Sequence, residues 1–388
     1  MRLLFLHAGA ELYGADRILL ELVDGMVKHG HVASVVLPSD GPLVGALRQA
    51  GAEVRIHSLG VLRRKYFSLP GLFNRFVRIV SATFFVGGII RREAIDIVHS
   101  NTSAVLVGAI ASRLTRRKHV WHIHEITTKP QMVRRLFSWL IPRGADRVVC
   151  VSEAVRRHLI AGDRLNEFKA IVIHNGIEAR QGASGGRARV RQELGLAGDD
   201  VLIGMIGRVN HWKGQHALVD AARLVAQSKP NARFLLVGGT FAGEEQLLIN
   251  LRQRVVDEGL SERVTVWDFR SDIADILAAL DVFVLPSIEP DPFPTVVLEA
   301  MHAGVPIVAF AHGGVQEMVE KDRTGYLVPP CDVIGMAEAI SKLIEMGLAR
   351  KSFGDAGQRR VAMLFTKKRF VEDFASLYES LGVLRGNP

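Results

Sequence analysis

The sequence predicts an α/β protein built from two facing doubly wound Rossmann-like domains with a cleft between them. Three observations lead to this fold. At 388 residues the chain is longer than one hydrophobic core usually supports. In both halves, short β-branched runs alternate with segments of helical spacing, a pattern typical of a parallel sheet covered by helices. The two halves are separated by a stretch rich in Gly, Ala, Ser and Arg.

Five runs in the first half are predicted as strands: RLLFLHA, HVASVVLP, IDIVHSN, HVWHIHE and DRVVCVS. Helical segments such as GADRILLELVDGMVKHG separate them. The second half repeats the rhythm with DVLIGMIGRV, ARFLLVGG, RVTVWDF, DVFVLPS and VPIVAF. Between the halves, residues 176–192 are predicted as an exposed linker. Because ligands of such sheets bind at the carboxyl ends of the strands, we expect a substrate in the cleft between the domains.

Composition limits the class of protein. The chain is 48% hydrophobic and 23% charged, which is ordinary for a globular protein. With only Cys150 and Cys331, the chain has no disulfide framework or cysteine metal site to argue for, so a reducing, cytoplasmic location is expected. The opening residues have too short an apolar core for a signal peptide. No stretch approaches the ~20 uninterrupted apolar residues of a spanning helix.

The positive charge belongs to the first half of the chain. Residues 1–188 carry 27 Lys and Arg against 14 Asp and Glu, a balance of +13, which leaves −4 for residues 189–388. Residues 61–92 are the densest part, with seven Lys and Arg, no acid and five phenylalanines: Phe67, Phe73, Phe76, Phe84 and Phe85. This segment is interpreted as a surface for an anionic membrane. The alternative is an ordinary helix with an apolar core face and a solvated basic face.

The stretch EPDPFPTVVLEAMHAGVPIVAF carries two acids, Asp291 and Glu299, around a predicted helix start. Pro294 disfavours helix at Phe293 but is accepted in a first turn, so the helix should begin near Pro294 or Thr295. The unpaired amides of such a start bind anions, usually phosphate. With a carboxylate on each side, the layout suits a nucleotide sugar. Taken singly, either acid is more simply a structural residue at a turn or helix start.

A second motif, GMIGRVNHWKGQHALVDAA, places Gly207, Arg208, Lys213 and Gly214 between a predicted strand and a helix. The Arg208 guanidinium can grip phosphate oxygens and Lys213 can add a mobile charge. Taken alone, each cation is more simply a solvated loop residue. Both together at a strand end, upstream of the second anion site, indicate a diphosphate site.

These motifs, with HGGVQEMVEKDRTGYLV, resemble the donor domain of the family 4 glycosyltransferases, which have the GT-B fold. The likeness covers nearly the whole chain. LYGADRILLELVDGM is similar to the first loop and helix of that family, HIHE to its acceptor-side histidine motif, and CVSEAVRRHL and IHNGI to its interdomain segments. FTKKRFVEDFASLYESL is similar to the final helix that crosses back to the first domain.

The resemblance implies domains and site residues. It implies an acceptor-binding domain at 1–176, joined by a crossover helix in 366–388, and a donor-binding domain at 177–365. Arg208 and Lys213 match the cations that stabilise the leaving diphosphate. His124 matches the histidine near the reacting sugar, whereas His122 is expected to be a satisfied core histidine on the opposite face of the strand. The expected donor-binding residues are Gly14, Gly207, Arg208, Lys213, Arg270, Asp291, Phe293, Pro294, Thr295, Val296 and Glu299.

The match departs from the family pattern at two positions. The first acid of the family's paired motif is usually Glu, where this chain has Asp291, with Glu289 two residues earlier as the alternative. Asp268 replaces the glycine usual before the loop that holds the nucleobase, where Arg270 falls. By resemblance, Glu299 binds the ribose, Asp291 acts on the donor sugar, and both belong with His124, Arg208 and Lys213 to the catalytic set.

The expected activity is transfer of a sugar, such as a hexose, from a nucleotide-diphosphate sugar to an acceptor hydroxyl, with retention of configuration. No metal or other cofactor is expected. The acceptor is expected to be a glycan or lipid-linked precursor in polysaccharide or cell-envelope biosynthesis, reached by peripheral attachment to the inner face of the cell membrane. A GT-B nucleotide-sugar epimerase is the alternative. Neither HAGAELYGAD nor GGTFAG has the spacing of a dehydrogenase fingerprint, and no nucleic-acid module is recognised despite a pI near 9.8.

Overall fold

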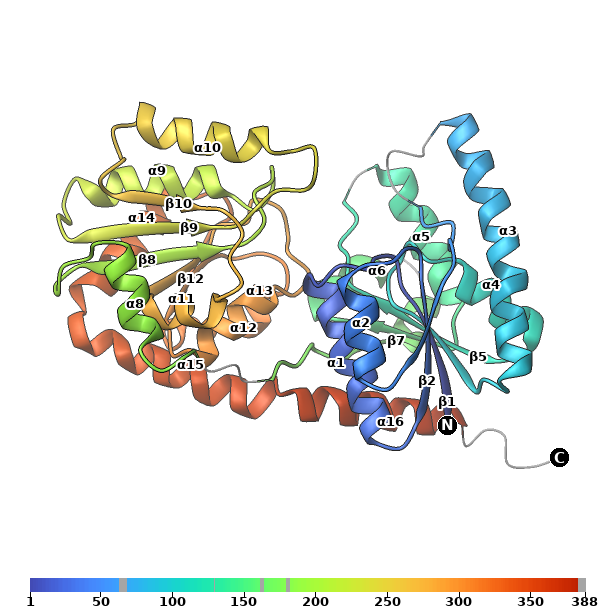
Figure 1. Cartoon of the computed structure of the whole chain (residues 1–388). Helices are drawn as coiled ribbons and strands as arrows, with labels where there is room; N and C mark the ends of the chain where they lie inside the picture. Colours follow the sequence, from blue (N-terminus) through green and yellow to red (C-terminus); the bar gives the residue numbers. More distant parts are fainter. Residues whose placement is uncertain (63–67, 129, 161–163, 179–181, 383–388) are drawn as a thin grey trace. The chain divides into compact units, whose positions relative to one another are not determined.

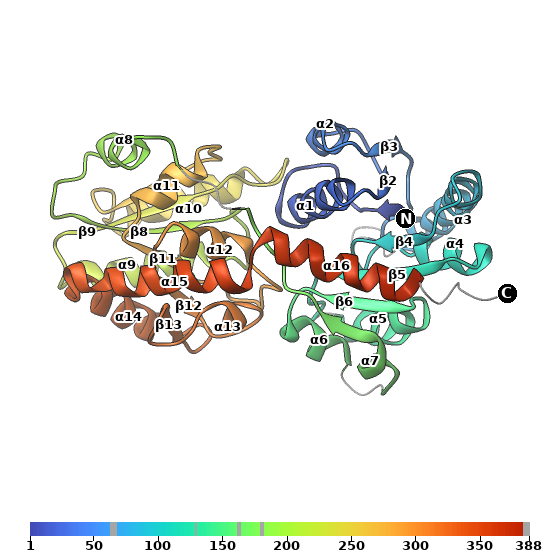
Figure 2. The ribbon, with the colours of Figure 1, turned by 90° about the horizontal axis from the view of Figure 1, so that it is seen from below.

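The computed structural model describes residues 1–62, 68–128, 130–160, 164–178 and 182–382, and Figures 1 and 2 show its ribbon. The chain forms two compact units. The first comprises Met1–Gly176 and Thr366–Pro388, and the second comprises Ile177–Phe365. Each unit is built on one parallel sheet with helices on both faces, so the predicted doubly wound α/β fold is confirmed.

The first unit holds a seven-stranded sheet in the order β3-β2-β1-β4-β5-β6-β7. Its strands are β1 (Arg2–Leu6), β2 (Val32–Leu37), β3 (Glu53–Ile56), β4 (Ile97–Ser100), β5 (Lys118–Ile123), β6 (Arg147–Cys150) and β7 (Ala170–Val172). The two edge strands, β3 and β7, were not predicted. Both are short and incompletely buried, so they lack the continuous apolar run that identified the central strands.

The helices of the first unit divide between the two faces of the sheet because the strand order reverses after β3. With right-handed crossovers, the helices that link β1 to β3 cover one face, and those that link β3 to β7 cover the other. The final helix packs into the core beside the first, as Figure 2 shows. The helices are α1 (Gly14–Lys28), α2 (Pro42–Gln49), α3 (Leu69–Arg92), α4 (Val107–Thr115), α5 (Gln131–Arg143), α6 (Glu153–Ile160), α7 (Arg164–Lys169) and α16 (Lys367–Gly382).

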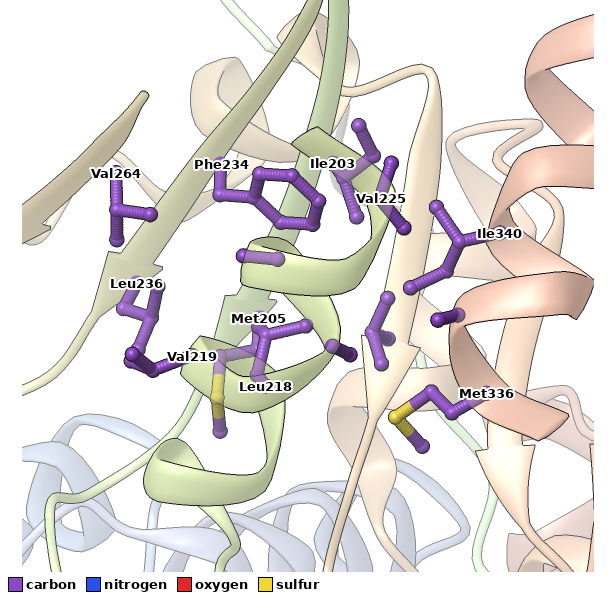
Figure 3. Packing of buried hydrophobic residues seen from close by; sticks show 14 of the residues in the cluster. Ile203, Met205, Leu218, Val219, Val225, Phe234, Leu236, Val264, Met336 and Ile340 are labelled. Atoms are coloured by element: carbon purple, nitrogen blue, oxygen red, sulfur yellow. The ribbon is translucent and has the colours of Figure 1, made fainter. Parts of the chain in front are cut away.

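The second unit holds a six-stranded sheet in the order β10-β9-β8-β11-β12-β13. Its strands are β8 (Val201–Ile206), β9 (Ala232–Val237), β10 (Val264–Trp267), β11 (Val282–Leu285), β12 (Ile307–Phe310) and β13 (Gly325–Val328). β13 is the one that was not predicted. Figure 3 shows the core on one face of this sheet, where Phe234 and Ile203 meet Leu218 of one helix and Ile340 of another.

The helical elements of the second unit include a segment that was expected to be linker. They are α8 (Gly186–Glu193), α9 (Gln215–Ala226), α10 (Gln246–Asp257), α11 (Ile273–Ala279), α12 (Thr295–His302), α13 (Val315–Met318), α14 (Val333–Glu345), the 3-10 helix η2 (Gly347–Arg350) and α15 (Lys351–Leu364).

The linker expectation is wrong for residues 186–192. Arg189 pairs with Asp272 and Asp275 on and before α11, and Arg191 pairs with Asp281 at 3.0 Å. Val190 is fully buried between them. The arginines that suggested a solvated linker therefore attach α8 to the second unit.

The helix α3 is longer and more apolar than the sequence reading allowed. By length and composition alone, Pro70–Arg92 is the one helix of the described residues that could cross a membrane, and 33% of its apolar window is buried. Its second half is a core helix, because Ala82, Val86, Ile89 and Ile90 lie under α4 and the sheet. Its first half has little cover, as Figure 1 shows. Arg63, Arg64, Lys65 and Phe67 lie outside the described residues.

Candidate functional site

The loop from β8 to α9 lies where the strand order of the second sheet reverses, because β8 has β9 on one side and β11 on the other. Asn210 shapes this loop: its side-chain oxygen accepts hydrogen bonds from the backbone N–H groups of Trp212 (3.1 Å) and Lys213 (2.9 Å). Gly214 has φ +80°, and a Cβ there would lie 1.8 Å from the carbonyl oxygen of Pro286. Only glycine allows the two loops after β8 and β11 to meet so closely.

Lys213 and Asp291 form an ion pair across these two loops. The Lys213 Nζ donates to Asp291 Oδ2, and the Asp291 residue is 7% exposed. The Lys213 Nζ also lies 4.2 Å from the centre of the Trp212 ring. The sequence reading assigned these side chains to different parts of a donor, and the pairing itself was not foreseen.

The segment HGGV holds the backbone of the Asp291 loop. Gly313 has φ +67°, and a Cβ there would lie 2.3 Å from the carbonyl oxygen of Asp291. The N–H of Gly314 donates to the same oxygen at 2.8 Å. Asp291 is thus held at its backbone by Gly314 and at its carboxylate by Lys213. Glu289, the alternative first acid, is exposed.

The helix start predicted near Pro294 is confirmed. Pro294 is the N-cap of α12, with φ −70° and ψ 99°, and Thr295 is its first residue. The Phe293 side chain is buried and contacts Phe365 edge-on at 5.8 Å. Thr295, Val296 and Glu299 are partly buried on this helix. The backbone N–H groups of the first turn of α12 therefore lie at the carboxyl edge of the sheet.

The Arg208 guanidinium stacks on Phe241, with its carbon 3.5 Å from the ring centre. Phe241 is half exposed and lies in the loop after β9, which is also at the carboxyl edge. This contact orients the guanidinium over the ring. The sequence reading missed Phe241, although GGTFAG follows a predicted strand and could have indicated it.

Arg270 is engaged by carboxylates. Its Nη1 donates to Glu193 at 2.6 Å, and its Nη2 donates to Asp272 at 2.8 Å. The hydrogen bonds to Asp272 and then Glu193 raise the pKa of Arg270 above its ordinary value. The guanidinium also stacks on Trp267 at 4.5 Å. The predicted role of Arg270 toward a nucleobase would have to coexist with these contacts. The Asp268 carboxylate accepts from the backbone N–H of Phe269.

Two predicted site residues, Gly14 and His124, lie in the first unit. Gly14 is the first residue of α1. Apart from its chain neighbours and the adjoining backbone of that helix, no atom of the described residues would lie within 4 Å of a Cβ added there. His124 follows β5 directly. Both are therefore at the carboxyl edge of the first sheet.

A line of hydrogen bonds connects His124 to the start of α1. The Nε2 of His124 lies 3.1 Å from Oδ1 of Asn101, and the amide nitrogen of Asn101 lies 3.1 Å from Nδ1 of His7. The Nε2 of His7 in turn lies 2.6 Å from Oδ1 of Asp16. In this arrangement His124 and His7 each carry a proton on Nε2, because an amide oxygen and a carboxylate only accept. Asp16 also accepts from the N–H of Tyr13, at the first turn of α1.

Asn101, His7 and Asp16 were not predicted as site residues. His7 and Asn101 stand at the ends of the predicted strands RLLFLHA and IDIVHSN, and β1 and β4 are neighbours in the sheet. The carboxyl ends of two adjacent parallel strands were the signal that could have identified them.

The expectation for His122 is partly wrong. Its ring is buried, but neither ring nitrogen has a hydrogen-bond partner among the described residues, so it is not a satisfied core histidine. Its ring centre lies 4.0 Å from that of His124, so the two do not lie on opposite faces. Residues two apart on a strand share a face.

The buried histidines of this sheet are held neutral. Desolvation lowers the pKa of His99 to about 3 and of His119 to about 4, and it also lowers the pKa of His124 to about 3. The pKa of His122 is likewise lowered, first by desolvation and then by His124. Within the described ranges no cluster of three or more metal-ligating side chains is found.

The geometry defines a two-unit α/β protein, with two cationic side chains and a helix start at one edge of the second sheet and with histidines at one edge of the first. Two family models match this chain. The model described as Glycosyltransferase Family 4 matches residues 13–181, and the model described as Glycosyl transferases group 1 matches residues 186–360. The chain belongs to the family 4 glycosyltransferases of the group 1 type. The epimerase alternative has no support among these matches.

Three relatives illustrate the similarity. The crystal structure of HepE from Anabaena in complex with UDP-glucose has a TM-score of 0.84 and 29% identity, covering 98% of this chain and 100% of that one. The UDP-Gal:alpha-D-GlcNAc-diphosphoundecaprenol alpha-1,3-galactosyltransferase of Escherichia coli is 26% identical over 270 residues, 66% of this chain and 68% of the relative. A D-inositol 3-phosphate glycosyltransferase of Mycobacteroides abscessus is 31% identical over 212 residues, 54% of this chain, and the match spans less than half (46%) of the relative's length.

Proposed function

We propose that this glycosyltransferase moves a sugar from a nucleotide-diphosphate sugar to an acceptor hydroxyl, with the donor bound by the second unit. The observation that carries the proposal is the meeting of two loops at the strand-order reversal, which brings Arg208, Lys213 and the start of α12 to one edge. The HepE crystal structure, similar over 98% of this chain, holds UDP-glucose. We therefore take a UDP-sugar as the first donor to test.

In this proposal the diphosphate lies against the first amides of α12 and the side chains of Arg208 and Lys213. As the bond to the sugar breaks, negative charge grows on the departing phosphate oxygen, and these groups stabilise it. An ammonium has three N–H donors, so Lys213 can keep Asp291 and still donate to a phosphate. We propose that no metal is needed, since two cations and a helix start supply the charge.

In this proposal Glu299 and Asp291 bind different parts of the donor. Glu299 accepts hydrogen bonds from the ribose hydroxyls, and Asp291 orients the sugar through its fixed position beside Lys213. His124 positions the reacting sugar or the acceptor hydroxyl. Retention of configuration is the expected stereochemical outcome for this family, and NMR of the product anomer tests it.

We propose a lipid-linked glycan or polysaccharide precursor as the acceptor. The Escherichia coli relative is named for a diphosphoundecaprenol-linked acceptor. The basic and aromatic segment at 61–92 supports a cytoplasmic protein held at the inner face of the membrane. Within that segment Phe73, Phe76 and Phe84 are exposed, whereas Phe85 stacks on His57 with ring centres 4.1 Å apart.

The test measures release of nucleotide from a panel of nucleotide sugars, with and without lipid-linked acceptor and with and without a chelator. Glu299→Gln is expected to weaken binding of free nucleotide diphosphate, because it removes the charge that accepts from the ribose. Asp291→Asn is expected to act mainly on the donor sugar. Equal loss of nucleotide affinity in both variants would contradict this division, and loss of activity on chelation would contradict the metal-free mechanism.

A further inference from the structure

The helix α5 of the first unit presents an apolar face that lies outside the basic segment at 61–92. We propose that α5 and α3 together form one docking surface for an anionic lipid bilayer, with Trp139 as its interfacial anchor. The inference deepens the proposed membrane location and rests on it. It adds a second point of contact, which would set the orientation of the first unit on the membrane.

The evidence on α5 is the exposure of its large apolar side chains. Met132, Leu136 and Trp139 are 78%, 51% and 54% exposed. Their spacing of four and three residues places them on one stripe of the helix. Only Ile141 and Pro142, in its last turn, are buried. The stripe therefore faces away from the core of its own unit.

The helix α3 carries a matching stripe. Phe73, Val77, Val80 and Phe84 follow a spacing of four, three and four residues, and Phe73 and Phe84 are 70% and 76% exposed. The core face of α3 is a different set of residues in its second half. Thus the exposed stripe is additional to the face that packs in the unit, and the simple core-helix interpretation does not account for it.

The two stripes belong to one layer of helices. α3 and α5 both follow the reversal of strand order after β3, so both cover the same face of the sheet. α4 lies in that layer and packs along α3, and its own Leu114 is 64% exposed. Figures 1 and 2 show α3, α4 and α5 in sequence on this side of the unit. We infer that a flat partner can touch both stripes at once.

The positive charge of α3, α4 and α5 favours an anionic partner. The three helices carry eight arginines and no Asp, Glu or Lys: Arg75, Arg78, Arg91, Arg92, Arg113, Arg134, Arg135 and Arg143. On α5, Arg143 stacks on Trp139 at 5.0 Å and donates to its carbonyl oxygen. Arginines beside exposed aromatic and aliphatic side chains fit the phosphate and acyl layers of an anionic bilayer. A second copy of this chain would bring these arginines against each other, which like-charge repulsion opposes.

The contact is peripheral. The second half of α3 supplies Val86, Ile89 and Ile90 to the core of the first unit, and all three are fully buried. Crossing the bilayer would require that half to leave the core and expose the apolar groups beneath it. We infer that α3 and α5 lie along the membrane surface.

The experiment uses the full chain and vesicles of phosphatidylcholine alone or with phosphatidylglycerol. The wild type is expected to pellet with the anionic vesicles, and less so at high salt. Met132→Ser/Leu136→Ser/Trp139→Ser should weaken the partition onto these vesicles about tenfold or more. The matched control, Ile249→Ser/Val256→Ser/Met363→Ser, removes three exposed apolar side chains of the second unit and should pellet like the wild type.

A second readout follows Trp139 itself. Brominated phosphatidylcholine in the anionic vesicles should quench part of the wild-type tryptophan fluorescence, and Trp139→Phe should remove that quenching while the chain still pellets. Pelleting of the triple variant equal to that of the wild type, absence of quenching, or equal binding to neutral vesicles would overturn the proposal. Binding to an acidic protein with no binding to anionic vesicles would also overturn it.

The proposed enzyme activity is measured separately in the same samples. Nucleotide release to water or a soluble acceptor should be unchanged in the triple variant, since α5 holds none of the donor-site residues. A wild type that transfers sugar but does not pellet would overturn the docking surface and the proposed membrane location, and it would leave the proposed transfer reaction intact. A wild type that pellets but releases no nucleotide from any donor would overturn the proposed function alone.

Discussion

At the residue scale, the pair formed by Lys213 and Asp291 couples binding to stability. Both side chains are mostly buried, and each neutralises the other. Removing one partner leaves a buried charge, which costs more than the pair itself is worth. A loss of activity in Lys213→Ala therefore has two possible origins, one chemical and one structural, which a second variant separates.

Lys213→Ala is expected to lower turnover about tenfold to a hundredfold and stability by about 3 kcal/mol. The double variant Lys213→Ala/Asp291→Ala should recover most of the stability without recovering turnover, as measured by thermal unfolding and nucleotide release. Arg208→Ala should lower turnover by a similar factor with a smaller loss of stability. If Lys213→Ala kept the wild-type rate, the assignment of the diphosphate site would be wrong.

Asn101 offers a second test at the residue scale. Its side chain bonds both His7 and His124, so it fixes which ring nitrogen of His124 carries the proton. Asn101→Ala should lower the rate of transfer about tenfold while leaving the affinity for free nucleotide diphosphate unchanged, because that affinity is assigned to the second unit. A changed nucleotide affinity, or an unchanged transfer rate, would contradict a positioning role.

The site residues were predictable to different extents. Gly207, Arg208, Lys213, Asp291 and Glu299 could be named because their motifs lie between a recognisable strand and helix. The Lys213–Asp291 pair could not, since it depends on how closely two loops approach through Gly214 and Gly313. Local sequence patterns do not report distances between loops that are 78 residues apart in the chain.

At the element scale, the strands β4 and β5 bury histidines that must stay neutral. His99 and His119 are about 1% exposed, and desolvation lowers the pKa of both rings far below the ordinary 6.5. In the unfolded chain these rings bind protons below pH 6.5, whereas in the folded chain they do so only near pH 3 to 4. The contribution of these neutral histidines to the stability of the first unit is therefore complete above pH 6.5 and is lost progressively as the pH falls toward 4.

Each such histidine should reduce stability by about 1.4 kcal/mol per pH unit between pH 6 and 4. Thermal unfolding followed from pH 7.5 to 4.5 should show this slope. His122→Leu should make the slope shallower, since the ring of His122 has no hydrogen bond to lose among the described residues and its pKa is lowered in the same direction. His211→Asn, at an exposed position of the second unit, serves as the control. An unchanged slope in His122→Leu would show that this histidine does not contribute to it.

Elements with a local physical cause were the ones that the sequence predicted. The start of α12 follows from the geometry of Pro294, and the central strands follow from their continuous apolar runs. The helix α8 was missed because its arginines look solvated until Asp272, Asp275 and Asp281 are brought beside them. The exposed stripe of α5 was missed because its apolar spacing resembles that of any core helix.

At the scale of the whole molecule, the last helix completes the first unit. Phe370, Phe374 and Tyr378 of α16 are fully buried there, and Tyr378 bonds His99 at 2.7 Å. Lys367 pairs with Glu21 and Asp24 of α1. Burying three aromatic side chains stabilises a fold by about 5 to 9 kcal/mol, which is comparable to the whole stability of a typical domain.

A chain that ends at Phe365 is therefore expected to lose the fold of the first unit. Circular dichroism and limited proteolysis should show cleavage within residues 1–176 of the truncated chain. A chain that ends at Gly382, which retains all of α16, is the control and should resist the protease like the full chain. Protection of residues 1–176 without α16 would contradict this account.

The contribution of α16 also has a consequence for the order of folding during synthesis. The first unit begins at Met1 but lacks part of its core until residues near Leu381 have been made. The second unit is complete at Phe365, before α16 exists. On the ribosome, the second unit can therefore complete its fold before the first unit does. Until α16 has been made, the first unit exposes the apolar surface that α16 covers. Chaperone dependence of the nascent chain should accordingly persist until α16 has left the ribosome.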